Sequence, residues 1–131
     1  MAVRKRILVV DDDPMVLFVF RDTLKDLGDA YEIVATQSGL EALHEIREMP
    51  FDLVITDLTM PDLGGVQLTE AIGQTRPDTI VVWITAFGCH SVSLDAARLG
   101  IYRCYDKPLE VDEILQIARE VLDAGSVPSA S

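Results

Sequence analysis

Short apolar runs alternate along the chain with longer amphipathic stretches. The runs at 7–10, 51–56 and 79–84 are rich in β-branched and aliphatic residues, which is typical of strands covered on both faces. Weaker runs at 31–35 and 102–105 predict two further strands. The pattern therefore predicts five short strands.

Apolar residues at helical spacing predict a helix after each strand. Pro14 suits the first turn of the first helix, and Gly28 is placed to end it. Ser38 followed by Glu41 has the spacing of a capping box, which marks the start of the second helix. The other three helices are expected at 65–72, 91–99 and 111–122.

This alternation predicts an α/β fold of one domain. We expect a doubly wound, flavodoxin-like parallel sheet of five strands in the order 2-1-3-4-5, with five helices on its two faces. The domain is expected to span residues 3–124. Residues 125–131 are rich in Gly, Ser, Ala and Pro, which predicts a flexible tail or the start of a linker.

The charge balance narrows the classes of partner. The 131 residues include 11 basic and 22 acidic ones, a formal net charge of −11, which disfavours binding to nucleic acid or to an anionic membrane surface. The longest uncharged stretch, 79–94, is too short and polar to cross a bilayer. Only four apolar residues follow the basic N-terminus, too few for a secretory signal, so we expect a cytoplasmic protein.

Charged and polar residues follow four of the predicted strands. An acidic residue after a strand often caps the next helix, and Asp13 before Pro14 fits that role. Several carboxylates gathered at one sheet edge would repel each other, and a divalent cation such as Mg²⁺ relieves this repulsion. The constellation predicts a magnesium and phosphoryl site. Its members are Asp11, Asp12, Asp13, Asp57, Thr85 and Lys107.

These motifs resemble the response-regulator receiver domain of two-component signalling. The resemblance covers roughly residues 3–124, and the motifs lie at the spacing of that family. They are the stretch from Ile7 to Pro14, Asp57 to Pro61 with Gly65, Thr85-Ala86, and Lys107-Pro108.

The resemblance implies a Mg²⁺-dependent phosphoacceptor. Asp57 would be the nucleophile that takes the phosphoryl group. Asp12 and Asp57 would bind Mg²⁺ directly, Asp11 would act mainly through water, and the backbone carbonyl of Thr59 would be a further ligand. Lys107 would hold one phosphoryl oxygen.

The remaining implications concern the switch and its partners. Thr85 would donate its hydroxyl to the phosphoryl group, and the Lys107–Pro108 peptide bond would be cis. The donor would be a histidine kinase or phosphotransfer protein. An output partner or fused domain would bind the face formed by the fourth helix, fifth strand and fifth helix. Such a domain catalyses its own phosphorylation and dephosphorylation and is not a turnover enzyme.

One departure from the family pattern lies at the switch position, three residues before Lys107, where an aromatic residue is usual. This chain has Cys104 there, and Tyr102, two residues away, is expected to share its sheet face and to replace part of the missing ring. Cys89 and Cys104 form no CxxC motif, so we expect reduced thiols. A redox role for Cys104 is disfavoured because no nearby His or CxxC would lower its pKa.

Three other functions compete with this interpretation. A haloacid-dehalogenase-like phosphatase would use Asp11 as nucleophile and Asp13 as general acid, but would leave Asp57 unused. A degenerate receiver that only binds proteins is disfavoured by the intact acidic site. A flavin or nucleotide binder would need a phosphate-cradling loop after the first strand, where the three consecutive aspartates would repel phosphate unless a metal were bound.

Overall fold

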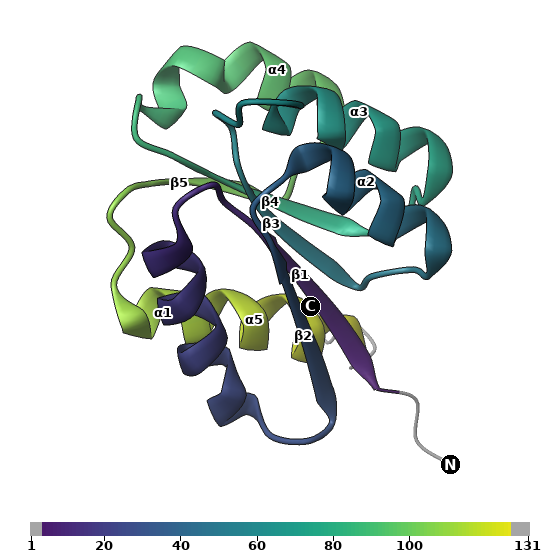
Figure 1. The fold of residues 1–131 in the computed structure, drawn as a ribbon, viewed down its shortest axis with the longest axis vertical. Helices are drawn as coiled ribbons and strands as arrows, with labels where there is room; N and C mark the ends of the chain where they lie inside the picture. The colour runs from purple at the N-terminus through teal and green to yellow at the C-terminus, as the bar shows by residue number, and fades with distance from the viewer. Residues whose placement is uncertain (1–3, 127–131) are drawn as a thin grey trace.

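The structure is a computed structural model that describes residues 4–126. Five parallel strands form one sheet in the order β2-β1-β3-β4-β5, which confirms the predicted fold class (Figure 1). In such an order the connections leave in opposite directions from β1 and β3, so a crevice forms beyond their carboxyl ends. The strands are β1 (Lys5–Val10), β2 (Tyr31–Thr36), β3 (Leu53–Asp57), β4 (Ile80–Thr85) and β5 (Arg103–Asp106).

The helices form a layer on each face of the sheet. Figure 1 shows α1 and α5 on one face and α2, α3 and α4 on the other. Their bounds are α1 (Pro14–Leu24), α2 (Gly39–Glu48), α3 (Gly65–Thr75), α4 (Ser93–Leu99) and α5 (Val111–Ser126), and the short 3₁₀ helices are η1 (Lys25–Leu27) and η2 (Cys89–Val92). No helix in the described part of the chain has the length and apolar character needed to cross a membrane.

The two faces of the sheet carry two separate apolar cores. Successive strand residues point to opposite faces, so Ile7 and Val9 pack toward α1 and α5, whereas Leu8 and Val10 pack toward α2 and α3. Trp83 belongs to the second core, and its indole N–H donates to Thr69 Oγ1 at 2.8 Å. Burial on both faces explains why the central strands are continuous apolar runs.

Both predicted helix caps are present. Asp13 Oδ1 accepts a hydrogen bond from the Met15 N–H at 2.9 Å, and Ser38 Oγ accepts one from the Glu41 N–H at 3.1 Å. The segment 91–99 differs from the prediction, because it begins in η2 and only its second part is α-helical. Helix α5 continues to Ser126, and the rest of the predicted tail, 127–131, lies outside the described residues.

The cysteine prediction is wrong. Cys89 and Cys104 are joined by a disulfide, with their Cα atoms 5.8 Å apart. The two residues are 15 positions apart in sequence. They meet because α4 leads the chain back along the sheet, which places the segment after β4 beside β5. The absence of a CxxC motif does not exclude a disulfide between cysteines that are far apart in sequence but close in the fold.

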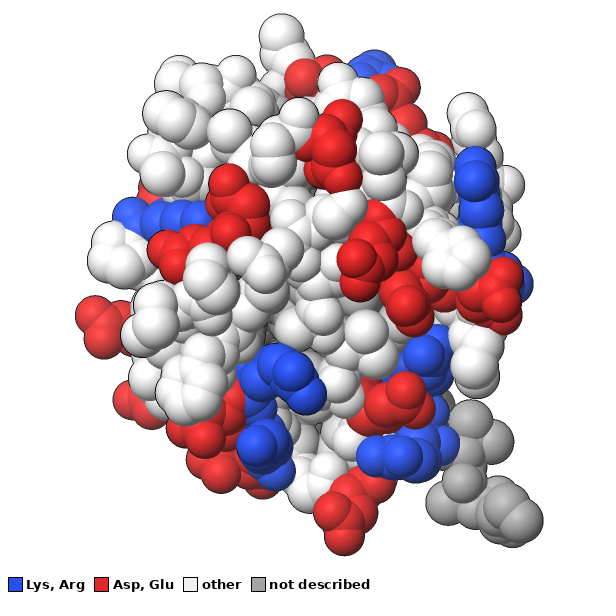
Figure 2. Space-filling model, in the orientation of Figure 1, with Lys and Arg blue, Asp and Glu red and all other residues white. Residues whose placement is uncertain are grey.

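Charge is unevenly spread over the surface. Figure 2 shows acidic side chains in scattered patches over the face that is seen in Figure 1, with several basic ones in its lower part and others near its margins. This distribution agrees with the formal net charge of −11. This view shows no broad basic surface of the kind that binds the phosphate backbone of a nucleic acid.

Candidate functional site

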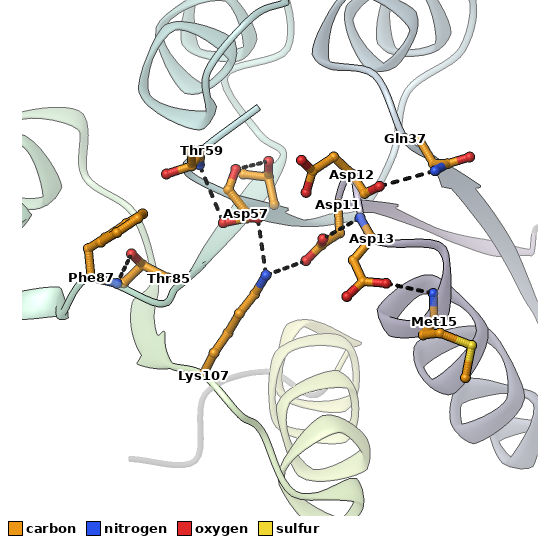
Figure 3. Close-up of polar contacts among 11 residues, drawn as sticks. Asp11, Asp12, Asp13, Met15, Gln37, Asp57, Thr59, Thr85, Phe87 and Lys107 are labelled. Atoms are coloured by element: carbon orange, nitrogen blue, oxygen red, sulfur yellow. Dashed lines mark hydrogen bonds and ion pairs between the residues drawn. The ribbon is translucent and has the colours of Figure 1, made fainter. Parts of the chain in front are cut away.

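Four strand ends deliver the predicted residues to one edge of the sheet. Asp11 directly follows β1, Asp57 ends β3, Thr85 ends β4, and Lys107 directly follows β5. Since all five strands are parallel, their carboxyl ends share this edge. Figure 3 shows Lys107 reaching across it toward Asp57 and Asp11.

Lys107 joins the two buried carboxylates. Its Nζ lies 2.8 Å from Asp11 Oδ2 and 3.1 Å from Asp57 Oδ2. The Lys107–Pro108 peptide bond is cis, as predicted. The backbone N–H of Lys107 donates to the Thr85 carbonyl at 2.8 Å, which fixes the start of the segment after β5 against the end of β4.

Burial and charge act in opposite directions on these groups. Asp11 is fully buried, and desolvation raises the pKa of its carboxyl even though Lys107 and the Asp13 N–H favour the charged form. Burial alone would lower the pKa of Lys107, but its contacts with Asp11 and Asp57 outweigh burial, so its pKa is raised. Lys107 therefore stays charged over the physiological pH range.

Three carboxylates form a cluster that suits a hard cation. One oxygen each from Asp11, Asp12 and Asp57 lies within 4.8 Å of the other two. Backbone groups help to orient the buried pair: the Asp13 N–H donates to Asp11 Oδ1 at 2.9 Å, and the Thr59 N–H donates to Asp57 Oδ1 at 3.3 Å. Asp12 remains exposed. An all-oxygen donor set that is open to water fits Mg²⁺, which keeps several waters when bound.

Thr85 lies at the edge of this group and is not yet directed at Asp57. Its side chain is buried, and its Oγ1 accepts a hydrogen bond from the Phe87 N–H at 3.0 Å. Figure 3 shows the Thr85 hydroxyl beside the Phe87 N–H, with no contact drawn from it to Asp57. In its contact with Phe87, Oγ1 only accepts, so its proton is free to be donated, and a move of Oγ1 toward a group on Asp57 would lengthen the bond to Phe87.

Gly65 allows the loop after β3 to pack closely. A Cβ at this position would lie 2.5 Å from the Asp57 carbonyl oxygen, which no side chain tolerates. The Gly65 N–H also donates to the Leu58 carbonyl at 3.0 Å. The loop is therefore held close to Asp57, as the Gly64-Gly65 pair suggests.

Sequence reasoning missed the role of Asp62 in the same loop. Its carboxylate accepts hydrogen bonds from Ser38 Oγ, from the Gly39 N–H at 3.1 Å and from the Leu40 N–H at 3.3 Å. These donors lie at the start of α2, and the Ser38 contact chiefly lowers the pKa of Asp62. The loop that follows Asp57 is thus tied to another helix. No local motif signals this, because α2 begins 23 residues earlier.

The expectation for Tyr102 is also wrong. Tyr102 precedes β5, and its hydroxyl is hydrogen-bonded to Glu120 of α5. Cys104 instead packs against the core on the α2 and α3 face, opposite Trp83 in the sheet register. Tyr102 therefore does not place its ring beside Cys104, whose sulfur is joined to Cys89.

Comparison with known families agrees with this site. The sequence model of the response regulator receiver domain matches residues 7–119. The chain belongs to the response regulator receiver domain family. Receiver domains are signalling domains rather than turnover enzymes.

Individual relatives show where such a domain occurs. The chain is similar to the chemotaxis protein CheY of Bacillus subtilis, at 30% identity over 90% of this chain and 98% of that protein. It is 32% identical to the transcriptional regulatory protein GlrR of Escherichia coli K12 over 89% of this chain, but spans only 26% of that protein. Among solved structures, a CheY-like receiver domain protein from Methanospirillum hungatei has a TM-score of 0.86 at 28% identity, covering 94% of this chain and 97% of that one.

Proposed function

We propose that this receiver domain accepts a phosphoryl group on Asp57 from a phosphohistidine, in a Mg²⁺-dependent reaction in the cytoplasm. The donor would be a histidine kinase or phosphotransfer protein. The observation that carries this proposal is the position of Lys107 Nζ, 2.8 Å from Asp11 and 3.1 Å from Asp57. A fixed cation beside a carboxylate nucleophile is what transfer between two anionic groups requires.

The side chains divide the work between attack and charge stabilisation. An oxygen of Asp57 attacks phosphorus as the bond from phosphorus to the donor imidazole nitrogen breaks, giving an acyl phosphate and a free imidazole. Lys107 lies close enough to shift its contact from the Asp57 carboxylate to a phosphoryl oxygen. Thr85 would donate its hydroxyl to another phosphoryl oxygen, because its contact with the Phe87 N–H leaves the hydroxyl proton free. Loss of the phosphoryl group to water would return the domain to its starting state.

The carboxylate cluster would hold the metal. Asp12 and Asp57 would be direct ligands, with Asp11 acting mainly through water and the Thr59 carbonyl as a further ligand. Mg²⁺ supplies positive charge that offsets the repulsion between the carboxylates and the incoming phosphoryl group. The exposed Asp12 leaves this side of the cluster open to the donor.

Two surfaces suit protein partners. Beside the site, Met15 and Val19 of α1 are 67% and 40% exposed, and they line a groove of about 270 Å³ between α1 and Pro108. A phosphodonor that must reach Asp57 would cover this apolar area. On the face of α4, β5 and α5, Leu94 and Tyr102 are also exposed, and we propose that an output partner or fused domain binds there.

Phosphoryl uptake tests the proposal. With Mg²⁺ and a small acyl phosphate, the intact protein should gain the mass of one phosphoryl group. Asp57→Asn should lose this gain because an amide is a poor nucleophile. Asp29→Asn, at an exposed turn before β2 and so at the opposite edge of the sheet, should keep it. Removal of Mg²⁺ should prevent the gain in every variant.

The phosphatase alternative predicts different outcomes. It requires Asp13 as a general acid, yet the Asp13 carboxylate caps α1 through the Met15 N–H. Under that mechanism Asp11→Asn would abolish activity, Asp57→Asn would have little effect, and phosphate monoesters would turn over rapidly. Steady monoesterase activity that survives Asp57→Asn would contradict the proposed function.

A further inference from the structure

The disulfide joins η2, which follows β4, to strand β5, on the outer side of the site. Cys89 is the first residue of η2, four positions after Thr85, and Cys104 lies in β5, three positions before Lys107. The bond therefore lies close in sequence to both residues that we propose contact the phosphoryl group. A second contact acts in parallel, because the Cys89 N–H donates to Asp106 Oδ1 at 2.8 Å.

The segment that the disulfide restrains is less tightly packed than the strands, because Val92, Ala96 and Leu99 are only partly buried against the second core. Among the described residues, neither η2 nor α4 contains a buried side chain, and Leu94 is 87% exposed. Thr85, by contrast, is held in β4 and is 2% exposed. Only Ala86, Phe87 and Gly88 lie between this fixed strand end and the cross-linked Cys89.

This short segment contains the group that now engages Thr85. The Phe87 N–H donates to Thr85 Oγ1 at 3.0 Å, although the Phe87 side chain is 74% exposed. A displacement of Thr85 Oγ1 toward a phosphoryl group on Asp57 would lengthen this bond, unless the Phe87 backbone moved with it. With Cys89 fixed to β5, the three intervening residues have little freedom to adjust. With Cys89 free, they can move together with η2.

We propose that Cys89 and Cys104 form a reversible thiol–disulfide site whose oxidation restrains the segment after Thr85 and so slows phosphoryl uptake on Asp57. The effect on uptake rests on the proposed function, whereas the reversible bond and its restraint do not. The co-reactant is a low-molecular-weight disulfide. The dithiol form is the more responsive one, and the disulfide form holds η2 and α4 against β5.

The exchange is balanced in atoms and electrons. The thiolate of one cysteine attacks a sulfur of the small disulfide, which forms a mixed disulfide and releases one small thiol. The thiolate of the other cysteine then attacks the protein sulfur of that mixed disulfide, which forms the Cys89–Cys104 bond and releases the second small thiol. The protein loses two electrons and two protons, and the small disulfide gains them.

Two observations favour a reversible disulfide over a permanent structural one. Both cysteines are partly exposed, so a small thiol or disulfide can reach them in the folded protein. The two apolar cores are built from buried residues of the strands and of α1, α2, α3 and α5, and a domain of this length does not need a disulfide to fold. In a reducing cytoplasm, disulfides are usually transient or redox-sensing.

The bond and its restraint are tested without a phosphodonor. The native protein is equilibrated in glutathione buffers of graded redox composition, free thiols are alkylated, and the mass is measured. We expect full and reversible conversion between dithiol and disulfide. Backbone hydrogen exchange in residues 86–92 should be faster in the dithiol form, and in Cys89→Ser it should be fast in both buffers. A bond that opens only when the protein unfolds, or equal exchange in both forms, overturns the proposal.

The rate of phosphoryl uptake then tests the consequence. With Mg²⁺ and a small acyl phosphate, uptake should be several-fold slower in the disulfide form, and Cys89→Ser should match the dithiol form whichever buffer is used. Uptake at the same rate in both redox forms overturns the link to phosphorylation. If neither form takes up a phosphoryl group, the proposed function fails, and hydrogen exchange still decides whether the restraint exists.

Discussion

The β1–β3 half of the sheet and the segment from η2 through β5 are held in place by different forces. Every residue of β3 is buried, and so are the last four residues of β1. In contrast, α4 has no buried residue and the four residues of β5 are exposed or half-buried. The first region depends on complete apolar burial, whereas the second combines partial apolar packing with polar and covalent links.

The links of the second region are individually weak or reversible. Arg98 of α4 pairs with Asp95 at 3.0 Å and Glu70 at 3.5 Å, all on the surface, and the disulfide adds the one covalent tie. Apolar burial responds little to pH or redox conditions, whereas ion pairs respond to pH and salt, and disulfides respond to redox conditions. We infer that the rigid half, the β1–β3 part of the sheet, holds Asp11 and Asp57 in position. The segment from η2 through β5 is better suited to conformational change.

The largest expected effect is on unfolding. Ile55→Ala, in fully buried β3, should lower the free energy of unfolding by about 2–5 kcal/mol, through lost burial and the cavity left behind. Leu94→Ala, on exposed α4, should change it by no more than about 0.5 kcal/mol. Urea denaturation of both variants measures the contrast. Equal losses would mean that the two regions are anchored alike.

Magnesium should stabilise the rigid half at its charged edge. At a concentration 100 times its Kd, Mg²⁺ should add about 2.7 kcal/mol to the free energy of unfolding, because it binds the folded cluster and not the unfolded chain. Asp12→Ala should remove most of this gain, and without metal its stability should equal or exceed that of the parent, because one repelling carboxylate is gone. Asp29→Ala should keep the gain. A melting temperature indifferent to Mg²⁺ would argue against a metal site.

The smallest effect is expected for Asp62, the polar link on the rigid side. Since its pKa lies below the ordinary value of 3.8, its contribution to stability is fully present above that pH and is lost as the pH falls toward the lowered pKa. Asp62→Asn should therefore lower the melting temperature slightly at neutral pH, and the difference should shrink below pH 3.8.

Thermal melts from neutral to acidic pH measure this dependence. The matched control is Asp78→Asn, an exposed aspartate in the turn before β4. The control should show no comparable pH-dependent difference from the parent. A loss for Asp62→Asn that stays constant with pH would mean that its carboxylate charge is not what stabilises α2.

The contrast between fully buried and partly buried elements also explains which features can be predicted from the sequence. The runs that form β1, β3 and β4 are readable because burial on both faces demands continuous apolar residues. The site follows from these strands, because each carries its polar residue to the carboxyl edge of the sheet. Asp11, Asp57 and Thr85 could therefore be placed at one edge from the sequence alone, and Lys107 joined them through the weaker run of β5.

The unpredicted features all depend on contacts across segments. The Cys89–Cys104 bond, the Asp62 contacts with the start of α2, and the Tyr102 contact with Glu120 join residues that are 15 to 24 positions apart. No periodicity in the sequence predicts these pairs, because each depends on how two separate loops or helices pack against the sheet. The polar and covalent links are thus the part that sequence patterns do not convey.

The chemical identity of the phosphorylated residue tests the central claim most directly. After reaction with Mg²⁺ and a small acyl phosphate, borohydride reduction converts an acyl phosphate on aspartate into homoserine, which peptide mass spectrometry locates. Asp57 is the carboxylate that lies 3.1 Å from Lys107 and has its other oxygen oriented by the Thr59 N–H. We predict homoserine at position 57 and nowhere else. Homoserine at position 11 or 12 would contradict the assignment of Asp57 as the phosphoacceptor.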